Sequence, residues 1–126
     1  MNERATLTWT AVLGVFLFVV HWAQDVAFGI DRIGLYSYGG VALMTLWLTS
    51  ATILRDGRAG KVILLLFSLL AAAMPALHLK GVRIAEIAKG EGGLLYLVVL
   101  LTLAVTAAFS ALLTVRALRR PKEAAN

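Results

Sequence analysis

Cysteine is absent from this chain of 126 residues. Its absence excludes disulfide bonds, thiolate zinc sites, iron–sulfur clusters and thiol redox chemistry. Charge is also scarce, since 15% of the residues are charged whereas 60% are hydrophobic. A water-soluble domain of this size cannot bury so large an apolar fraction, so the composition argues against an ordinary soluble fold.

Familiar catalytic signatures are absent as well. The sequence contains no Walker loop, no dinucleotide-binding glycine fingerprint, no HExxH motif and no G-x-S-x-G nucleophile elbow. An enzyme of the soluble type is therefore not expected, and we assign no catalytic residue. The net charge of +5 does not indicate a nucleic-acid partner, because the basic residues flank apolar segments instead of forming one basic face.

The apolar residues gather in four stretches, each close to the ~20 residues with which a helix crosses a bilayer. The stretches cover about 9–28, 36–54, 61–79 and 94–115, within a single domain of residues 1–126. The predicted fold class is therefore all-α, an integral membrane four-helix bundle. Pro75 predicts a kink in the third helix, and the mixed pattern between Lys80 and Gly93 is compatible with a short interfacial helix.

The first stretch has the apolar length of a secretory signal peptide as well. Glu3 accompanies Arg4 ahead of it, however, and no good small-x-small cleavage site follows. We therefore interpret this stretch as a retained membrane helix.

Lysine and arginine are distributed unequally between the two ends of the predicted helices. Eight lie on the side of the termini and four on the other side: Arg4, Arg55, Arg58, Lys61, Arg116, Arg119, Arg120 and Lys122 against Arg32, Lys80, Arg83 and Lys89. Basic residues near helix ends resist translocation, so the richer side is predicted to be cytoplasmic. Both termini, including the tail 116–126, should then lie in the cytoplasm, with the protein in the plasma (inner) membrane.

A few polar side chains are predicted to meet in the outer leaflet. Ionisable groups inside a bilayer cost at least ~2.5 kcal/mol each, so those that persist are usually paired or functional. His21 and Asp25 are spaced i, i+4 and share one helix face, and the third helix should bring His78 to about the depth of Asp25. The candidate ligand-binding or proton-handling residues are His21, Gln24, Asp25, Tyr38, His78 and Tyr96.

Structural interpretations of the same residues stay open. Asp25 and His78 can be interfacial side chains, and a hydrogen bond between His21 and Asp25 can be purely structural. A stripe of hydroxyls at four-residue spacing in the last stretch, which comprises Thr102, Thr106, Ser110 and Thr114, can line a polar path. More often such hydroxyls bond the carbonyls four residues earlier or link neighbouring helices.

Three functions are compatible with these observations. The first is a small binding or transport module with a protonatable His21–Asp25 pair, because imidazole gains and loses a proton near neutral pH. The second is a non-catalytic accessory subunit that docks onto a larger membrane complex. The third is a redox or metal protein with His21 and His78 as ligands to haem iron, copper or zinc. Against this third hypothesis, residue counting places the two histidines roughly 7 Å apart in depth at 1.5 Å per residue.

The expected partners are the lipid bilayer and either a second copy of the chain, as a homodimer, or a larger membrane complex.

Overall fold

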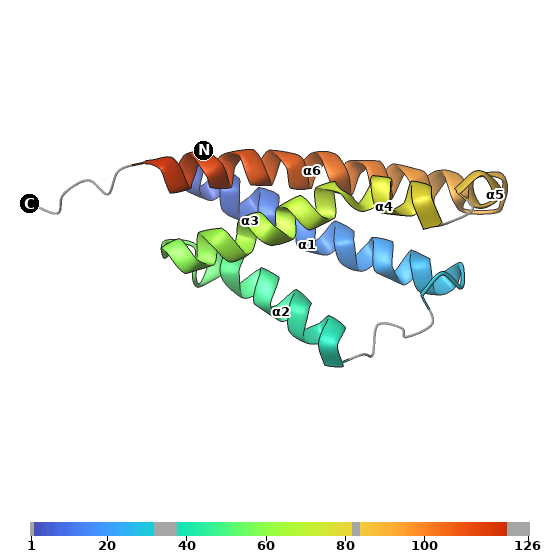
Figure 1. The fold of residues 1–126 in the computed structure, drawn as a ribbon, viewed down its shortest axis with the longest axis horizontal. Helices are drawn as coiled ribbons and strands as arrows, with labels where there is room; N and C mark the ends of the chain where they lie inside the picture. Colours follow the sequence, from blue (N-terminus) through green and yellow to red (C-terminus); the bar gives the residue numbers. More distant parts are fainter. Residues whose placement is uncertain (1, 32–37, 82–83, 121–126) are drawn as a thin grey trace, which may run out of the picture.

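The computed structural model describes residues 2–31, 38–81 and 84–120. These residues form six helices and no strand, so the all-α class is confirmed for them. The helices are α1 (Glu3–Ala27), α2 (Tyr38–Thr52), α3 (Arg58–Ala72), α4 (Met74–Gly81), α5 (Ile84–Lys89) and α6 (Gly93–Arg119). Figure 1 shows α6 extending along α1 and α3, whereas α2 diverges from the other helices toward its first residue.

Two of the four predicted stretches form helices long enough to cross a membrane, namely α1 and α6. Both are longer than expected. The side chain of Asn2 accepts a hydrogen bond from the amide of Ala5 at 2.8 Å and caps α1, which begins at Glu3, six residues before the predicted start. At the other end of the chain, α6 continues to Arg119, so the first residues of the predicted tail 116–126 are helical.

The other two stretches differ from the prediction. The stretch predicted at 36–54 forms α2 with 15 residues, although residues 36 and 37 lie outside the described part. The stretch predicted at 61–79 is divided at Ala73 into α3 and α4. Pro75 has no amide hydrogen to donate, so the bond to the carbonyl of Ala71 is missing and the helix is interrupted where the sequence predicts a kink. A short helix, α5, lies in the segment predicted to contain one.

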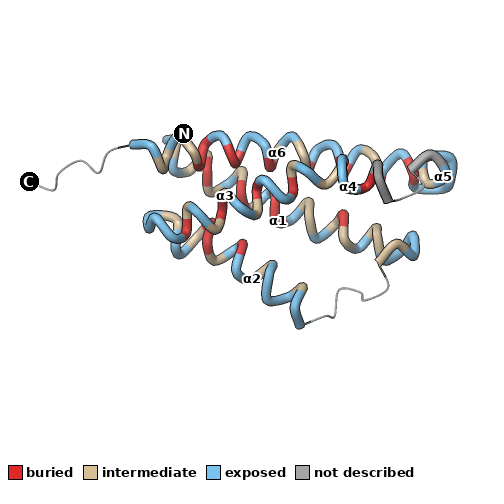
Figure 2. Tube along the Cα trace, in the orientation of Figure 1, coloured by how far each residue is buried: buried red, intermediate tan, exposed pale blue. Residues whose placement is uncertain are grey.

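The core lies where α1, α3 and α6 face one another. Leu64, Ala71, Leu103 and Ala107 are fully buried there, and Trp47 fixes α2 against this core. Figure 2 shows the buried positions on the inward sides of the helices and the exposed positions on their outward sides. Ser68 donates a hydrogen bond to Ser110 at 3.1 Å, which links α3 to α6 inside this core.

Several threonine hydroxyls bond the backbone of their own helix. Thr102 and Thr114 bond the carbonyls of Val98 and Ser110, four residues earlier. Thr45 and Thr52 of α2 do the same with Val41 and Leu48. These four hydroxyls are thereby satisfied within their own helices, as is common in apolar surroundings.

The start of α1 and the end of α6 meet at one end of the molecule. Arg120 forms an ion pair with Glu3, and Arg4 pairs with Asp56 at 3.1 Å. Arg55 donates a hydrogen bond to the hydroxyl of Thr8 at 3.2 Å. The basic residues near the termini therefore share one end, and the candidate site lies toward the other.

Candidate functional site

The C-terminal end of α1 fixes the backbone on which the site is built. The helix ends in a Schellman motif, in which the amide of Gly29 bonds the carbonyl of Val26 and the amide of Ile30 bonds the carbonyl of Asp25. Gly29 has φ +70°, a conformation that glycine adopts without strain. The motif turns the chain back along α1, and the amide of Asp31 also bonds the carbonyl of Asp25.

Asp25 is the centre of a polar cluster made by α1, α4 and α6. Its Oδ1 accepts a hydrogen bond from the hydroxyl of Tyr96 at 2.9 Å. Its Oδ2 lies 3.3 Å from Nε2 of His78 and 3.6 Å from Nε2 of His21. The i, i+4 spacing of His21 and Asp25 therefore places both side chains on the same inward face, as the sequence predicts.

The orientation of His78 is set by its own helix. Nδ1 of His78 lies 2.9 Å from the carbonyl oxygen of Met74. A carbonyl only accepts, so Nδ1 carries the hydrogen and a neutral ring presents a lone pair at Nε2. That lone pair faces the carboxylate of Asp25 at 3.3 Å, and two acceptors repel each other unless a proton or another cation lies between them.

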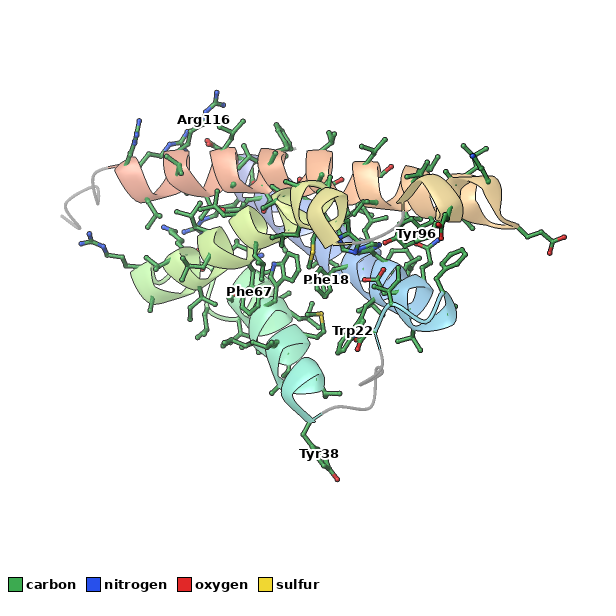
Figure 3. All side chains as sticks on the ribbon, turned by 45° about the vertical axis from the view of Figure 1, so that its right-hand side comes forward. Phe18, Trp22, Tyr38, Phe67, Tyr96 and Arg116 are labelled. Atoms are coloured by element: carbon green, nitrogen blue, oxygen red, sulfur yellow. The ribbon has the colours of Figure 1, made fainter. Side chains whose placement is uncertain are left out.

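Tyr96 closes the cluster from α6. Its side chain is fully buried, and its ring lies 5.2 Å from that of His21 and 5.5 Å from that of Phe28. Figure 3 shows Tyr96 pointing from α6 toward α1. Burial leaves the hydroxyl no solvent partner, so the bond to Asp25 satisfies it.

His21 is the least satisfied member of the cluster. It is 1% exposed, and neither ring nitrogen has a hydrogen-bond partner. Its ring lies 4.9 Å from that of His78. A buried polar atom without a partner costs about 1–3 kcal/mol, so such an atom in a native structure needs an explanation.

A cavity of about 580 Å³ adjoins this cluster. His21, Asp25 and His78 contribute to its wall, and most of the remaining wall is apolar or aromatic: Phe18, Trp22, Ile30, Asp31, Gly40, Leu43, Met44, Met74 and Leu77. An apolar cavity with a few converging polar groups is the usual form of a small-molecule site.

Two residues that bring a polar group to the cavity wall, Trp22 and Asp31, were not among the sequence candidates. The indole N–H of Trp22 donates a hydrogen bond to the carboxylate of Asp31, which fixes both side chains in the cavity wall. Asp31 lies between the first two predicted stretches, 9–28 and 36–54, where the sequence predicts no helix. The glycine at position 29 is the signal that could have indicated the turn, because a glycine just after a helix commonly reverses the chain direction.

The structure brings four of the six predicted site residues together: His21, Asp25, His78 and Tyr96. Tyr38 is placed elsewhere. It is 95% exposed at the start of α2 and points away from the cluster, as Figure 3 shows. Its predicted position was wrong because α2 diverges from α1 toward this residue. Gln24 is half-buried beside Asp25, and its side-chain oxygen has no hydrogen-bond partner.

The predicted separation in depth between the two histidines was also wrong. The depth of each histidine was counted from the predicted first residue of its helix, whereas α1 begins at Glu3 and α3 at Arg58. Counted from these residues, His21 and His78 differ by about two residues of rise, or ~3 Å. The rings contact each other directly, which leaves no space for a haem macrocycle with one histidine on each face. A small cation is compatible with the cluster, because its donor atoms are two imidazole nitrogens and a carboxylate oxygen.

The sequence matches no protein-family model, and neither a curated protein nor a solved structure is significantly similar to the chain. The functional argument therefore depends on the geometry of the cavity and its polar cluster.

Proposed function

We propose that this protein is a multi-pass membrane protein that binds a small, mainly apolar ligand in the cavity between α1, α2 and α4. The observation that carries this proposal is the cavity of about 580 Å³, whose wall is apolar except for a few polar groups that include His21, Asp25 and His78. Such a wall favours a ligand with one polar group on an otherwise apolar body, because the apolar surface provides affinity and the polar groups provide orientation.

Exposure of the apolar residues supports insertion in a membrane. Less than half of the most apolar segment of each long helix is buried inside the protein. The buried share of this segment is 22% in α1 and 44% in α6. The core helix of a soluble protein would be mostly buried instead. Large side chains such as Phe16 (62% exposed) and Val105 (70% exposed) face outward, where lipid would cover them.

The positions of the two ends of the chain support an even number of membrane crossings. Because Arg120 pairs with Glu3, the start of α1 and the end of α6 lie on the same side of the protein. We propose four crossings, with α3 and α4 together forming the third and α2 the second. The excess of lysine and arginine on the side of the termini makes that side cytoplasmic.

Single cysteines give a direct test of this topology, because the chain contains none of its own. Ala59→Cys and Glu91→Cys place a thiol on an exposed residue at each end. In intact cells, a membrane-impermeant maleimide should label Glu91→Cys at once and Ala59→Cys only after permeabilisation. Labelling of Ala59→Cys from outside would overturn the orientation, and equal labelling of both before permeabilisation would overturn the crossing pattern.

A lipophilic ligand could reach the cavity sideways through the bilayer. Trp22 and Met44 line this cavity and also a second one, of about 380 Å³, between α1 and α2. The second cavity is almost entirely apolar, with Val15, Val19, Val41, Thr45 and Leu48 in its wall. The two cavities adjoin where α2 diverges from α1, on a side that lipid would cover.

Native mass spectrometry of the protein, released gently from detergent, tests ligand binding. Wild-type protein should retain a small organic molecule in addition to the polypeptide. Met44→Trp should lower its occupancy by about tenfold or more, because the larger ring fills the junction of the two cavities. Ala42→Trp adds the same ring at an exposed position of α2 and should retain the molecule. Equal occupancy in the two variants would refute binding in this cavity.

A further inference from the structure

We propose that His21, Asp25 and His78 together bind one divalent transition-metal ion, such as Zn²⁺, with a coordination position open toward the cavity. The three donor atoms all lie within 4.8 Å of one another. This inference goes beyond ligand binding, because the metal site depends on these three side chains alone and would stand even if the cavity held no organic molecule.

The distances between the donor atoms fit a small ion. Bonds of about 2.0–2.1 Å in a tetrahedral arrangement separate neighbouring ligand atoms by about 3.3–3.4 Å. Oδ2 of Asp25 lies 3.3 Å from Nε2 of His78 and 3.6 Å from Nε2 of His21. Two of the three distances between ligand atoms are thus already close to those around a bound ion. A small rotation of His21, whose ring makes no hydrogen bond, can shorten the third distance, between the ligand nitrogens of His21 and His78.

The surrounding groups hold two of the ligands in the state that a metal requires. Nδ1 of His78 donates to the carbonyl of Met74, so that Nε2 presents its lone pair to the site. The hydroxyl of Tyr96 donates to Oδ1 of Asp25 and leaves Oδ2 directed at both histidines. Metal-binding histidines and carboxylates are commonly oriented by such outer partners, and the partners influence affinity.

The buried ring of His21, whose two nitrogens have no hydrogen-bond partner, is the independent observation that favours a metal ion over a proton in this site. A proton between Nε2 of His78 and Oδ2 of Asp25 would satisfy these two atoms, yet both nitrogens of His21 would remain buried without a partner. A metal ion accepts a nitrogen of His21 as well, so one ion accounts for all three side chains. Neutral imidazole and carboxylate together are a common ligand set for zinc and for iron(II).

The fourth position of this ion would face the cavity. His21, Asp25 and His78 are all part of the cavity wall, so a water molecule or the polar group of a ligand in the cavity can reach the ion. Three protein ligands with one open position are typical of metal sites that contact a substrate, whereas structural sites have four protein ligands. The class of ligand that the site would take therefore has an oxygen or nitrogen donor on an apolar body.

Metal titration of the purified full chain tests the proposal. The protein, without affinity tag and after treatment with EDTA, is titrated with Zn²⁺ by calorimetry and with Co²⁺ by visible absorption. One ion should bind per chain. Asp25→Asn, His21→Leu and His78→Leu should each lower the affinity by about 100-fold or more, and Tyr96→Phe, which removes an outer partner, by about tenfold.

Asp56→Asn is the matched control, because Asp56 is an exposed carboxylate that pairs with Arg4 at the other end of the molecule and should leave the affinity unchanged. Asp25→Asn is the decisive variant, since its amide can still accept from Tyr96 and circular dichroism can confirm that it is folded. Folded wild-type protein that binds neither ion tighter than about 1 mM would overturn the proposal, as would wild-type affinity in Asp25→Asn. Ligand occupancy in native mass spectra is measured separately, so failure of the metal site leaves the test of the cavity intact.

Discussion

Replacing Asp25 with alanine should lower the free energy of unfolding by about 3 kcal/mol in metal-free micelles. The carboxylate accepts from Tyr96 of α6 and contacts Nε2 of His78 of α4, so its removal leaves buried polar atoms on two helices without a partner. Each such atom costs about 1–3 kcal/mol when no partner replaces the lost one. The loss is measured by titration with a denaturing detergent, with helicity and tryptophan fluorescence as signals.

Two further variants show whether this loss belongs to the cluster. Asp25→Asn should cost less than about 1 kcal/mol, because its amide oxygen can accept from Tyr96 and its N–H can donate to Nε2 of His78. Asp56→Ala removes an exposed carboxylate that pairs with Arg4, and exposed ion pairs contribute about 0–1 kcal/mol. If Asp25→Ala were no more destabilising than Asp56→Ala, the cluster would contribute nothing to folding.

Replacing Trp47 with alanine should lower the free energy of unfolding by about 3–5 kcal/mol. The side chain is 1% exposed and fixes α2 to its neighbours. Its ring stacks on Phe67 of α3 with centroids 5.3 Å apart, and it packs edge-on against Phe18 of α1 at 5.7 Å. Gly14 of α1 lies beside it, where a Cβ would make an ordinary van der Waals contact at 3.6 Å from Cζ2 of Trp47. Loss of the ring leaves a cavity at the meeting point of three helices.

Trp9→Ala is the control of the same residue type. Trp9 is 65% exposed on α1, so its removal leaves no cavity and should cost less than about 1 kcal/mol. Trp47→Phe should also be tolerated, at less than about 1.5 kcal/mol, because it keeps an aromatic ring and removes an indole N–H that has no partner. Equal losses for Trp9→Ala and Trp47→Ala would contradict the packing role of Trp47.

The sequence predicts which side chains lie together where this depends on residue spacing within one helix. His21 and Asp25 share a face because they are four residues apart, and the structure has them in contact. His78 and Tyr96 were predicted at the depth of Asp25, and both contact its carboxylate. Depth along a helix is a local property, since it depends only on the rise per residue and on where the helix begins.

The errors occurred where position depends on how helices are oriented. Tyr38 was assigned to the same layer, yet α2 diverges from α1 and leaves it 95% exposed. The estimated 7 Å between the histidines failed for a related reason, because the starts of the helices were misplaced. Asp31 was not predicted to approach Trp22, since that contact requires the reversal of the chain at Gly29.

The sequence by itself determined that the chain is helical, apolar over most of its length and poor in ionisable groups, with His21 and Asp25 on one helix face and His78 at about the depth of Asp25. Composition and periodicity are sufficient for this, because they set which surfaces can be hidden from water and which side chains share a helix face. Only the tertiary structure decided that these three side chains converge beside a cavity. Convergence depends on helix rotation, on the interruption at Ala73 and on the chain reversal after α1, which arise from packing between segments distant in the sequence.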